Sequence, residues 1–146
     1  MKQPATVRDV LELLQEQHNA RGAAYRELSS RDVAPEAQLL LDRLTTLEAE
    51  SVTILSKELE RMPERTAFLA SGPPVSHDAV NPTGCQHDSN PTFEEVLDCA
   101  FQTRTIAELL HRLEGIAAES VRELLERLKG QEDARLRQVA SLSNLS

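Results

Sequence analysis

Aromatic side chains and cysteines are scarce in this sequence, and each shortage excludes a class of protein. The 146 residues include no Trp, one Tyr and three Phe, so the core must be aliphatic, and no aromatic stripe for base binding is visible. Cys85 and Cys99 are too few for a disulfide framework and favour a reducing cytosol. With few β-branched runs as well, the composition predicts an all-α protein.

Long apolar runs and excess positive charge are also missing. No stretch approaches the roughly 18 apolar residues that cross a bilayer, and the first residues, MKQPATVRDV, lack the apolar core of a signal peptide. The formal net charge of −8 argues against a nucleic-acid partner, which needs a basic footprint. We therefore expect one cytoplasmic domain over residues 1–146, with no membrane and no nucleic-acid contact.

Apolar residues recur at helical spacing in four stretches. Thr6 and Thr92 stand where helix N-caps belong, and Thr92 begins a capping box with Glu95. Pro35 suits the first position of a helix, and Pro63 marks an end. The predicted helices cover about residues 6–29, 35–61, 92–115 and 118–141.

Residues 62–91 separate the two pairs of predicted helices. The part from Ser71 to Pro91 holds four prolines and two glycines and has no periodicity, which predicts a long crossover. Such a loop is expected when the second and third helices run parallel. It contains His77, Cys85 and His87, whose loose spacing favours a solvated loop over a metal site.

One phrase occurs twice, 84 residues apart. Residues 40–51 read LLDRLTTLEAES and residues 124–135 read LLERLKGQEDAR, with identity at five of the twelve positions. The repetition indicates one helical hairpin used twice. It also places Glu48 and Glu132 at equivalent positions, each within an apolar stripe.

Several polar residues interrupt the apolar stripes at mid-length of the predicted helices. Charged groups rarely enter a core without partners, because desolvation disfavours their ionised form. The sequence therefore predicts a polar network in the interior. Its candidate members are His18, Arg21, Glu48, Ser51, Thr103, Glu132 and Arg135.

The pattern resembles the ferritin-like superfamily, and rubrerythrin-like four-helix bundles in particular. The segments that carry the resemblance are AAYRELSS (23–30) with LLDRLTTLEAES, and LLHRLEG (109–115) with LLERLKGQEDAR. The resemblance implies two helical hairpins joined by one long crossover. It also implies a Glu on the first helix of each hairpin and Glu-x-x-His on the second, together binding two iron or manganese ions.

Most of the ligands that the resemblance implies are replaced in this chain. Glu48 and Glu132 match the two Glu-x-x-His glutamates, but Ser51 and Arg135 stand at the histidine positions. His18 and Thr103 stand where the other two glutamates would be. A metal, if bound, would thus have only Glu48, Glu132 and His18 as ligands.

We therefore expect ion pairs and hydrogen bonds in place of the two metals, with no cofactor. The alternative is that Arg21 and Arg135 extend outward from the edge of the stripe. The predicted function is non-enzymatic: a structural or interaction module that self-associates, a homodimer being favoured, or binds a protein partner. The alternatives are an iron- or manganese-binding oxidoreductase or iron-handling protein, and a small-anion binder that uses the core.

Overall fold

The computed structural model describes residues 4–70 and 90–145, and their secondary structure is helical apart from a single β-bridge between Thr6 and Ala70. The chain is therefore all-α over this part. The first pair of helices, α1 (Val7–Ser29) and α2 (Pro35–Arg61), agrees closely with the predicted ranges. Thr6 and Asp9 form a capping box at the start of α1, and Pro35 is the first residue of α2.

The second half of the chain differs from the prediction in one respect. The single helix expected over residues 92–115 is two helices, α5 (Phe93–Ala100) and α6 (Arg104–Glu114), and α7 (Glu119–Leu142) follows. A short 3₁₀ helix, Ser143–Leu145, ends the described chain. Thr92 and Glu95 form the predicted capping box on α5.

The predicted crossover at residues 62–91 was wrong at its beginning. A short helix, α3 (Glu64–Ala67), follows Pro63. The backbone then returns to the start of α1, where the amide of Val7 donates to the carbonyl of Leu69 over 2.9 Å. Residues 71–89, with His77, Cys85 and His87, lie outside the described residues.

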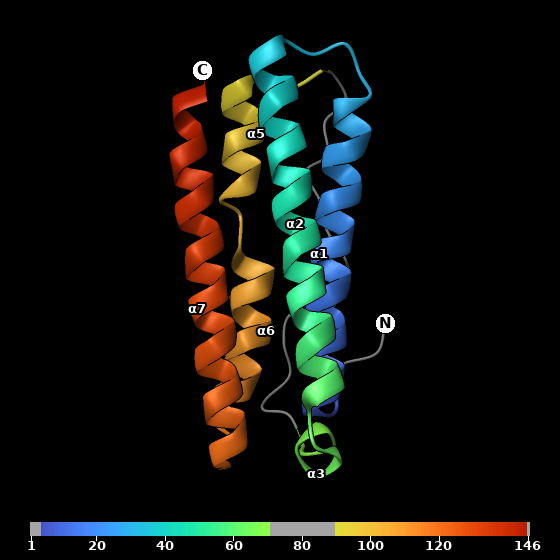
Figure 1. Ribbon diagram of the computed structural model, residues 1–146, viewed down its shortest axis with the longest axis vertical. Coiled ribbons are helices and arrows are strands. Elements are labelled where there is room, and N and C mark those ends of the chain that lie inside the picture. Colours follow the sequence, from blue (N-terminus) through green and yellow to red (C-terminus); the bar gives the residue numbers. More distant parts are fainter. Residues whose placement is uncertain (1–3, 71–89, 146) are drawn as a thin grey trace.

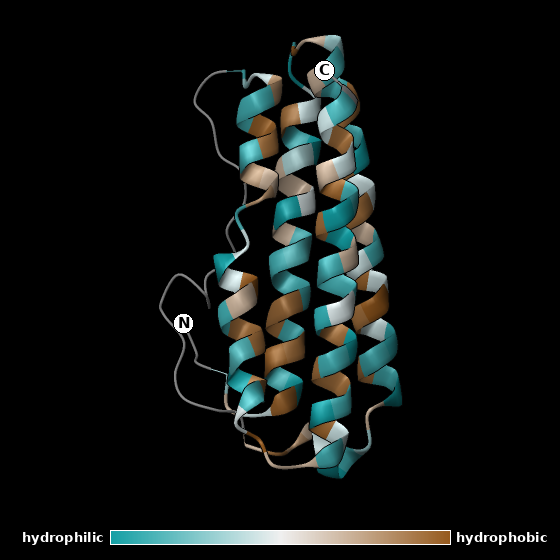
Figure 2. Ribbon diagram, turned by 90° about the vertical axis from the view of Figure 1, so that its left-hand side faces the viewer, coloured by the Kyte–Doolittle hydropathy of each residue, from teal (hydrophilic) through white to brown (hydrophobic). Residues whose placement is uncertain are grey.

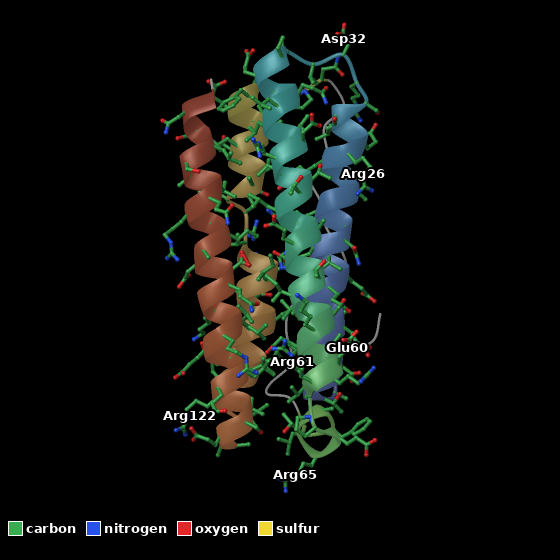
Figure 3. The ribbon with its side chains drawn as sticks, in the orientation of Figure 1. Arg26, Asp32, Glu60, Arg61, Arg65 and Arg122 are labelled. Carbon is green, nitrogen blue, oxygen red and sulfur yellow. The ribbon has the colours of Figure 1, made fainter. Side chains whose placement is uncertain are left out.

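The long helices lie lengthwise beside one another (Figure 1). Helices α1 and α7 run in one direction, while α2, α5 and α6 run in the other, so α2 is parallel to α5 and α6. Hydrophobic and hydrophilic residues alternate along each helix (Figure 2), as the amphipathic patterns require. Charged side chains such as Arg26, Glu60 and Arg122 extend from the outer faces (Figure 3).

The buried apolar side chains form two separate clusters. One joins the first half of α1 to α6 and to the first half of α7, and includes Leu11, Ile106 and Leu125. The other joins the last half of α1 to the first half of α2 and to α5, and includes Tyr25 and Leu44. Between the two clusters lie buried charged residues of three helices: Arg21 of α1, Glu48 of α2 and Arg135 of α7. A polar layer therefore divides the core. Glu58 and Arg112 are also buried but lie outside this layer.

Candidate functional site

The polar layer consists of five side chains from three helices: His18, Arg21, Glu48, Glu132 and Arg135. Four of them are at most 6% exposed, and the Glu132 side chain is 12% exposed. The two arginines are therefore buried and do not extend into solvent as the alternative interpretation required. The five side chains point into the core because each stands in the apolar stripe of its own helix.

Glu48 of α2 is the centre of the layer. Its Oε2 lies 2.5 Å from Nδ1 of His18, and its Oε1 accepts hydrogen bonds from Nε of Arg21 and Nη1 of Arg135, each over 3.0 Å. A carboxylate only accepts hydrogen bonds, so Nδ1 of His18 is the donor. One buried carboxylate thus connects α1 to α7.

Arg135 of α7 joins the two glutamates of the repeated phrase. Besides its bond to Glu48, it donates from Nε to Oε1 of Glu132 over 2.7 Å, and its Nη2 contacts the same oxygen. The guanidinium group therefore lies between Glu48 and Glu132. A planar, permanently charged group with several donors suits this bridging position.

Arg21 of α1 connects the layer to the break between α5 and α6. Its Nη1 donates to the carbonyl of Gln102 over 2.6 Å, and its Nη2 donates to the carbonyl of Ala100 and the hydroxyl of Tyr25, each over 3.1 Å. Ala100 is the last residue of α5, so no amide of that helix donates to its carbonyl. The buried Arg21 guanidinium group satisfies this carbonyl.

The charges within the layer balance. Glu48 and Glu132 supply two negative charges, and Arg21 and Arg135 supply two positive charges. Burial alone disfavours the Glu48 carboxylate, but the hydrogen bond and charge of His18, with Arg135 and Arg21, hold the pKa of Glu48 below its usual value. Burial likewise raises the pKa of the Tyr25 hydroxyl.

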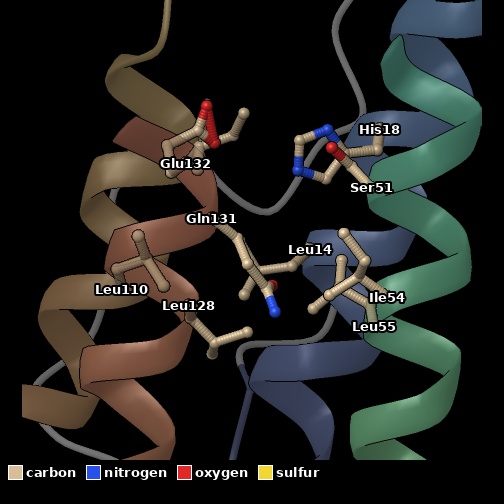
Figure 4. Close-up of a pocket in the computed structure, with 10 residues that line it drawn as sticks. Leu14, His18, Ser51, Ile54, Leu55, Leu110, Leu128, Gln131 and Glu132 are labelled. Atoms are coloured by element: carbon tan, nitrogen blue, oxygen red, sulfur yellow. The ribbon is translucent and has the colours of Figure 1, made fainter. Parts of the chain in front are cut away.

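Ser51 and Thr103, the other two predicted members of the network, have different positions. Ser51 lines a small cavity next to the layer, whereas Thr103 precedes α6 and does not cap it with its side chain. The cavity measures about 30 Å³, and its polar lining residues are His18, Ser51, Gln131 and Glu132. His18 and Ser51 face Glu132 across it (Figure 4).

Sequence reasoning missed the carbonyl groups of α5 and the hydroxyl of Tyr25 as members of the site. The sequence gives no sign that the Tyr25 hydroxyl accepts from a buried arginine, and the Ala100 carbonyl becomes available only because the helix breaks after that residue. Neither Gly nor Pro stands within residues 92–114 to signal that break. The long-range contact of Arg21 could not be read from local patterns.

The geometry leaves little room for a metal among the predicted ligands. Both Glu48 oxygens accept hydrogen bonds from protein groups, and Oε1 of Glu132 faces Arg135. Within residues 4–70 and 90–145, no three His, Cys, Asp or Glu side chains form a group that could hold a metal ion. The arrangement favours charge pairing, and a metal would have to displace a guanidinium group.

Cys99 is partly buried, packs against the second apolar cluster and is disulfide-bonded. The sequence holds one other cysteine, Cys85, which is outside the described residues. Disulfides are rare in the cytosol, so this bond does not support the predicted cytoplasmic location. Of the described helices, none has the length and apolar character of a membrane span.

Comparisons with known proteins give this chain no relative: no family model, no curated protein and no solved structure matches it. Its function must therefore be argued from the polar layer.

Proposed function

We propose that this protein is a non-enzymatic ferritin-like four-helix bundle, a structural or interaction module in which a salt-bridge layer replaces a di-metal site. The observation that carries the proposal is the guanidinium group of Arg135 between Glu48 and Glu132. These two glutamates are the ligands that the ferritin-like resemblance would retain. The cation between them is supplied by the chain itself.

The balance of charge supports this proposal. A dinuclear site needs several carboxylates to offset the charge of its ions. Here the two carboxylates are matched by Arg21 and Arg135, both of which bind Glu48 over 3.0 Å. A divalent ion added to the layer would bring uncompensated positive charge into a buried position, which is costly.

Metal analysis of the purified protein tests the proposal. After exposure to Fe²⁺ or Mn²⁺ and removal of excess ions, we expect less than stoichiometric metal by mass spectrometry. Stoichiometric metal that is lost in Glu48→Ala but kept in Glu126→Ala would overturn the proposal. Glu126 is the matched control because it is an exposed acid on α7.

The metal-binding oxidoreductase or iron-handling protein is the second candidate, and one observation favours it. His18 faces Glu132 across the cavity (Figure 4), and its Nε2 is not the nitrogen that Glu48 engages. An imidazole held by a carboxylate through Nδ1 is typical of metal-binding histidines. The same metal analysis separates the two candidates.

The small-anion binder has weaker support. The cavity of about 30 Å³ has room for about two water molecules, and Arg135 is already bound to two carboxylates. A thermal-shift screen with acetate and phosphate tests this candidate. A rise in the melting temperature that depends on His18 and Arg135 would favour it.

Self-association is part of the proposal, with a homodimer as the expected state. Light scattering coupled to size-exclusion chromatography measures it directly. A mass of about twice the 16.2 kDa of the chain would support the dimer. The mass of a single chain at every concentration would contradict the dimer. The interaction module would then have to bind a different protein.

A further inference from the structure

The break between α5 and α6 is not marked by Gly or Pro. The residues from Thr92 to Glu114 contain neither, and their apolar periodicity predicts one continuous helix. Thr103 stands at the N-cap position of α6, but its side chain makes no capping hydrogen bond there. We therefore attribute the break to a tertiary contact near residues 101–103.

The backbone at the break departs from the helical conformation, slightly at Phe101 and further at Thr103. Phe101 has φ −88° and ψ −3°, and Thr103 has φ −121° and ψ 14°, against about −63° and −42° in an α-helix. Helix α6 continues in the direction of α5 (Figure 1). Rotations of up to about 60° in these dihedral angles would bring both residues to helical values.

The Arg21 side chain binds the carbonyls that a continuous helix would need. It donates to the carbonyls of Gln102 over 2.6 Å, Ala100 over 3.1 Å and Cys99 over 3.4 Å. In a continuous helix the Ala100 carbonyl would accept from the amide of Arg104, and the Gln102 carbonyl from the amide of Ile106. The guanidinium group therefore binds the same carbonyl oxygens that a continuous helix would use.

We propose that Arg21 is a latch that holds the α5–α6 break open, and that the two helices join into one when it is removed. Glu48 fixes the guanidinium group through an ion pair of 3.0 Å. The positive charge then lies against the negative end of α5, which stabilises a helix that ends at Ala100. This inference does not depend on the proposed function, because it concerns only the contacts of Arg21.

Amide hydrogen exchange measured by NMR tests the latch in Arg21→Gln, with Arg26→Gln as the control. Arg26 is an exposed arginine on the same helix. In Arg21→Gln we expect the amides of Arg104 and Ile106 to exchange about tenfold more slowly or slower still, because each gains a helical acceptor. The control should leave both rates unchanged. Unchanged rates in Arg21→Gln, with α5 and α6 still protected, would overturn the proposal.

A second variant keeps the test decisive if Arg21→Gln fails to fold. The double substitution Arg21→Gln and Glu48→Gln also removes the negative charge that Arg21 neutralises, so no new unpaired carboxylate remains at Glu48. The same protection of the Arg104 and Ile106 amides is expected. Fast exchange of these two amides in the folded double variant would show that another contact causes the break.

Discussion

Replacing Arg135 by Met should destabilise the protein far more than replacing a surface arginine. The Arg135 side chain is 4% exposed and binds both Glu48 and Glu132. Breaking a buried ion pair by removing one partner costs about 3–5 kcal/mol. We expect the low end, about 3 kcal/mol, because Glu48 keeps His18 and Arg21, and Glu132 borders a cavity that water can enter.

Urea unfolding at pH 7, followed by circular dichroism, measures this difference. The matched control is Arg137→Met, which removes an exposed arginine from the same helix and should change the free energy of unfolding by at most about 0.5 kcal/mol. Adding Glu132→Gln to Arg135→Met should recover part of the loss, since it neutralises the carboxylate left unpaired. If Arg135→Met unfolds at the same urea concentration as the control, Arg135 does not hold the layer together.

Three further predictions concern pH, the helix interior and the Tyr25 hydroxyl. Folding lowers the pKa of Glu48, so its contribution to the free energy of unfolding is fully present above the unfolded pKa of about 4.3 and is lost as the pH falls through the folded value. In that acid range, Glu48→Gln should make the free energy of unfolding less dependent on pH. The exposed control Glu50→Gln should not change this dependence. Gly130→Ala should raise the free energy of unfolding by up to about 1 kcal/mol, because a Cβ at Gly130 would meet nothing within 4 Å; a lower melting temperature would contradict this. Tyr25→Phe should cost about 1 kcal/mol in urea unfolding through the lost bond to Arg21, and no cost would mean that this bond is unimportant.

The sequence predicted the helices well where local signals exist. The two capping threonines, Thr6 and Thr92, were predicted from the sequence, and each forms a capping box in the structure. Pro35 begins its helix as expected. The all-α class follows from these signals and from the apolar periodicity. The short helix after Pro63 was missed, since four residues are too few to show a period.

The sequence predicted which residues form the polar layer better than it predicted their contacts. His18, Arg21, Glu48, Glu132 and Arg135 interrupt apolar stripes, and such residues must find partners. Which partner each one takes depends on distances between helices, and these are not encoded in the spacing along one helix. Thr103 was predicted to join the polar network on the assumption of one continuous helix, but it lies at the break before α6.

The hydrogen bonds of Arg21 to backbone carbonyls show why the rest of the site could not be predicted. A carbonyl is present at every residue, so a sequence gives no sign that those of Ala100 and Gln102 are available. They become available only when Arg21 of α1 lies against the end of α5. This contact joins residues about 80 positions apart.

A crystal structure of the protein soaked in Mn²⁺ would show which cation lies between Glu48 and Glu132. We expect density for the Arg135 guanidinium group between the two carboxylates, with no anomalous peak there. An anomalous manganese peak bound by Glu48 and Glu132, with Arg135 displaced from between them, would contradict it.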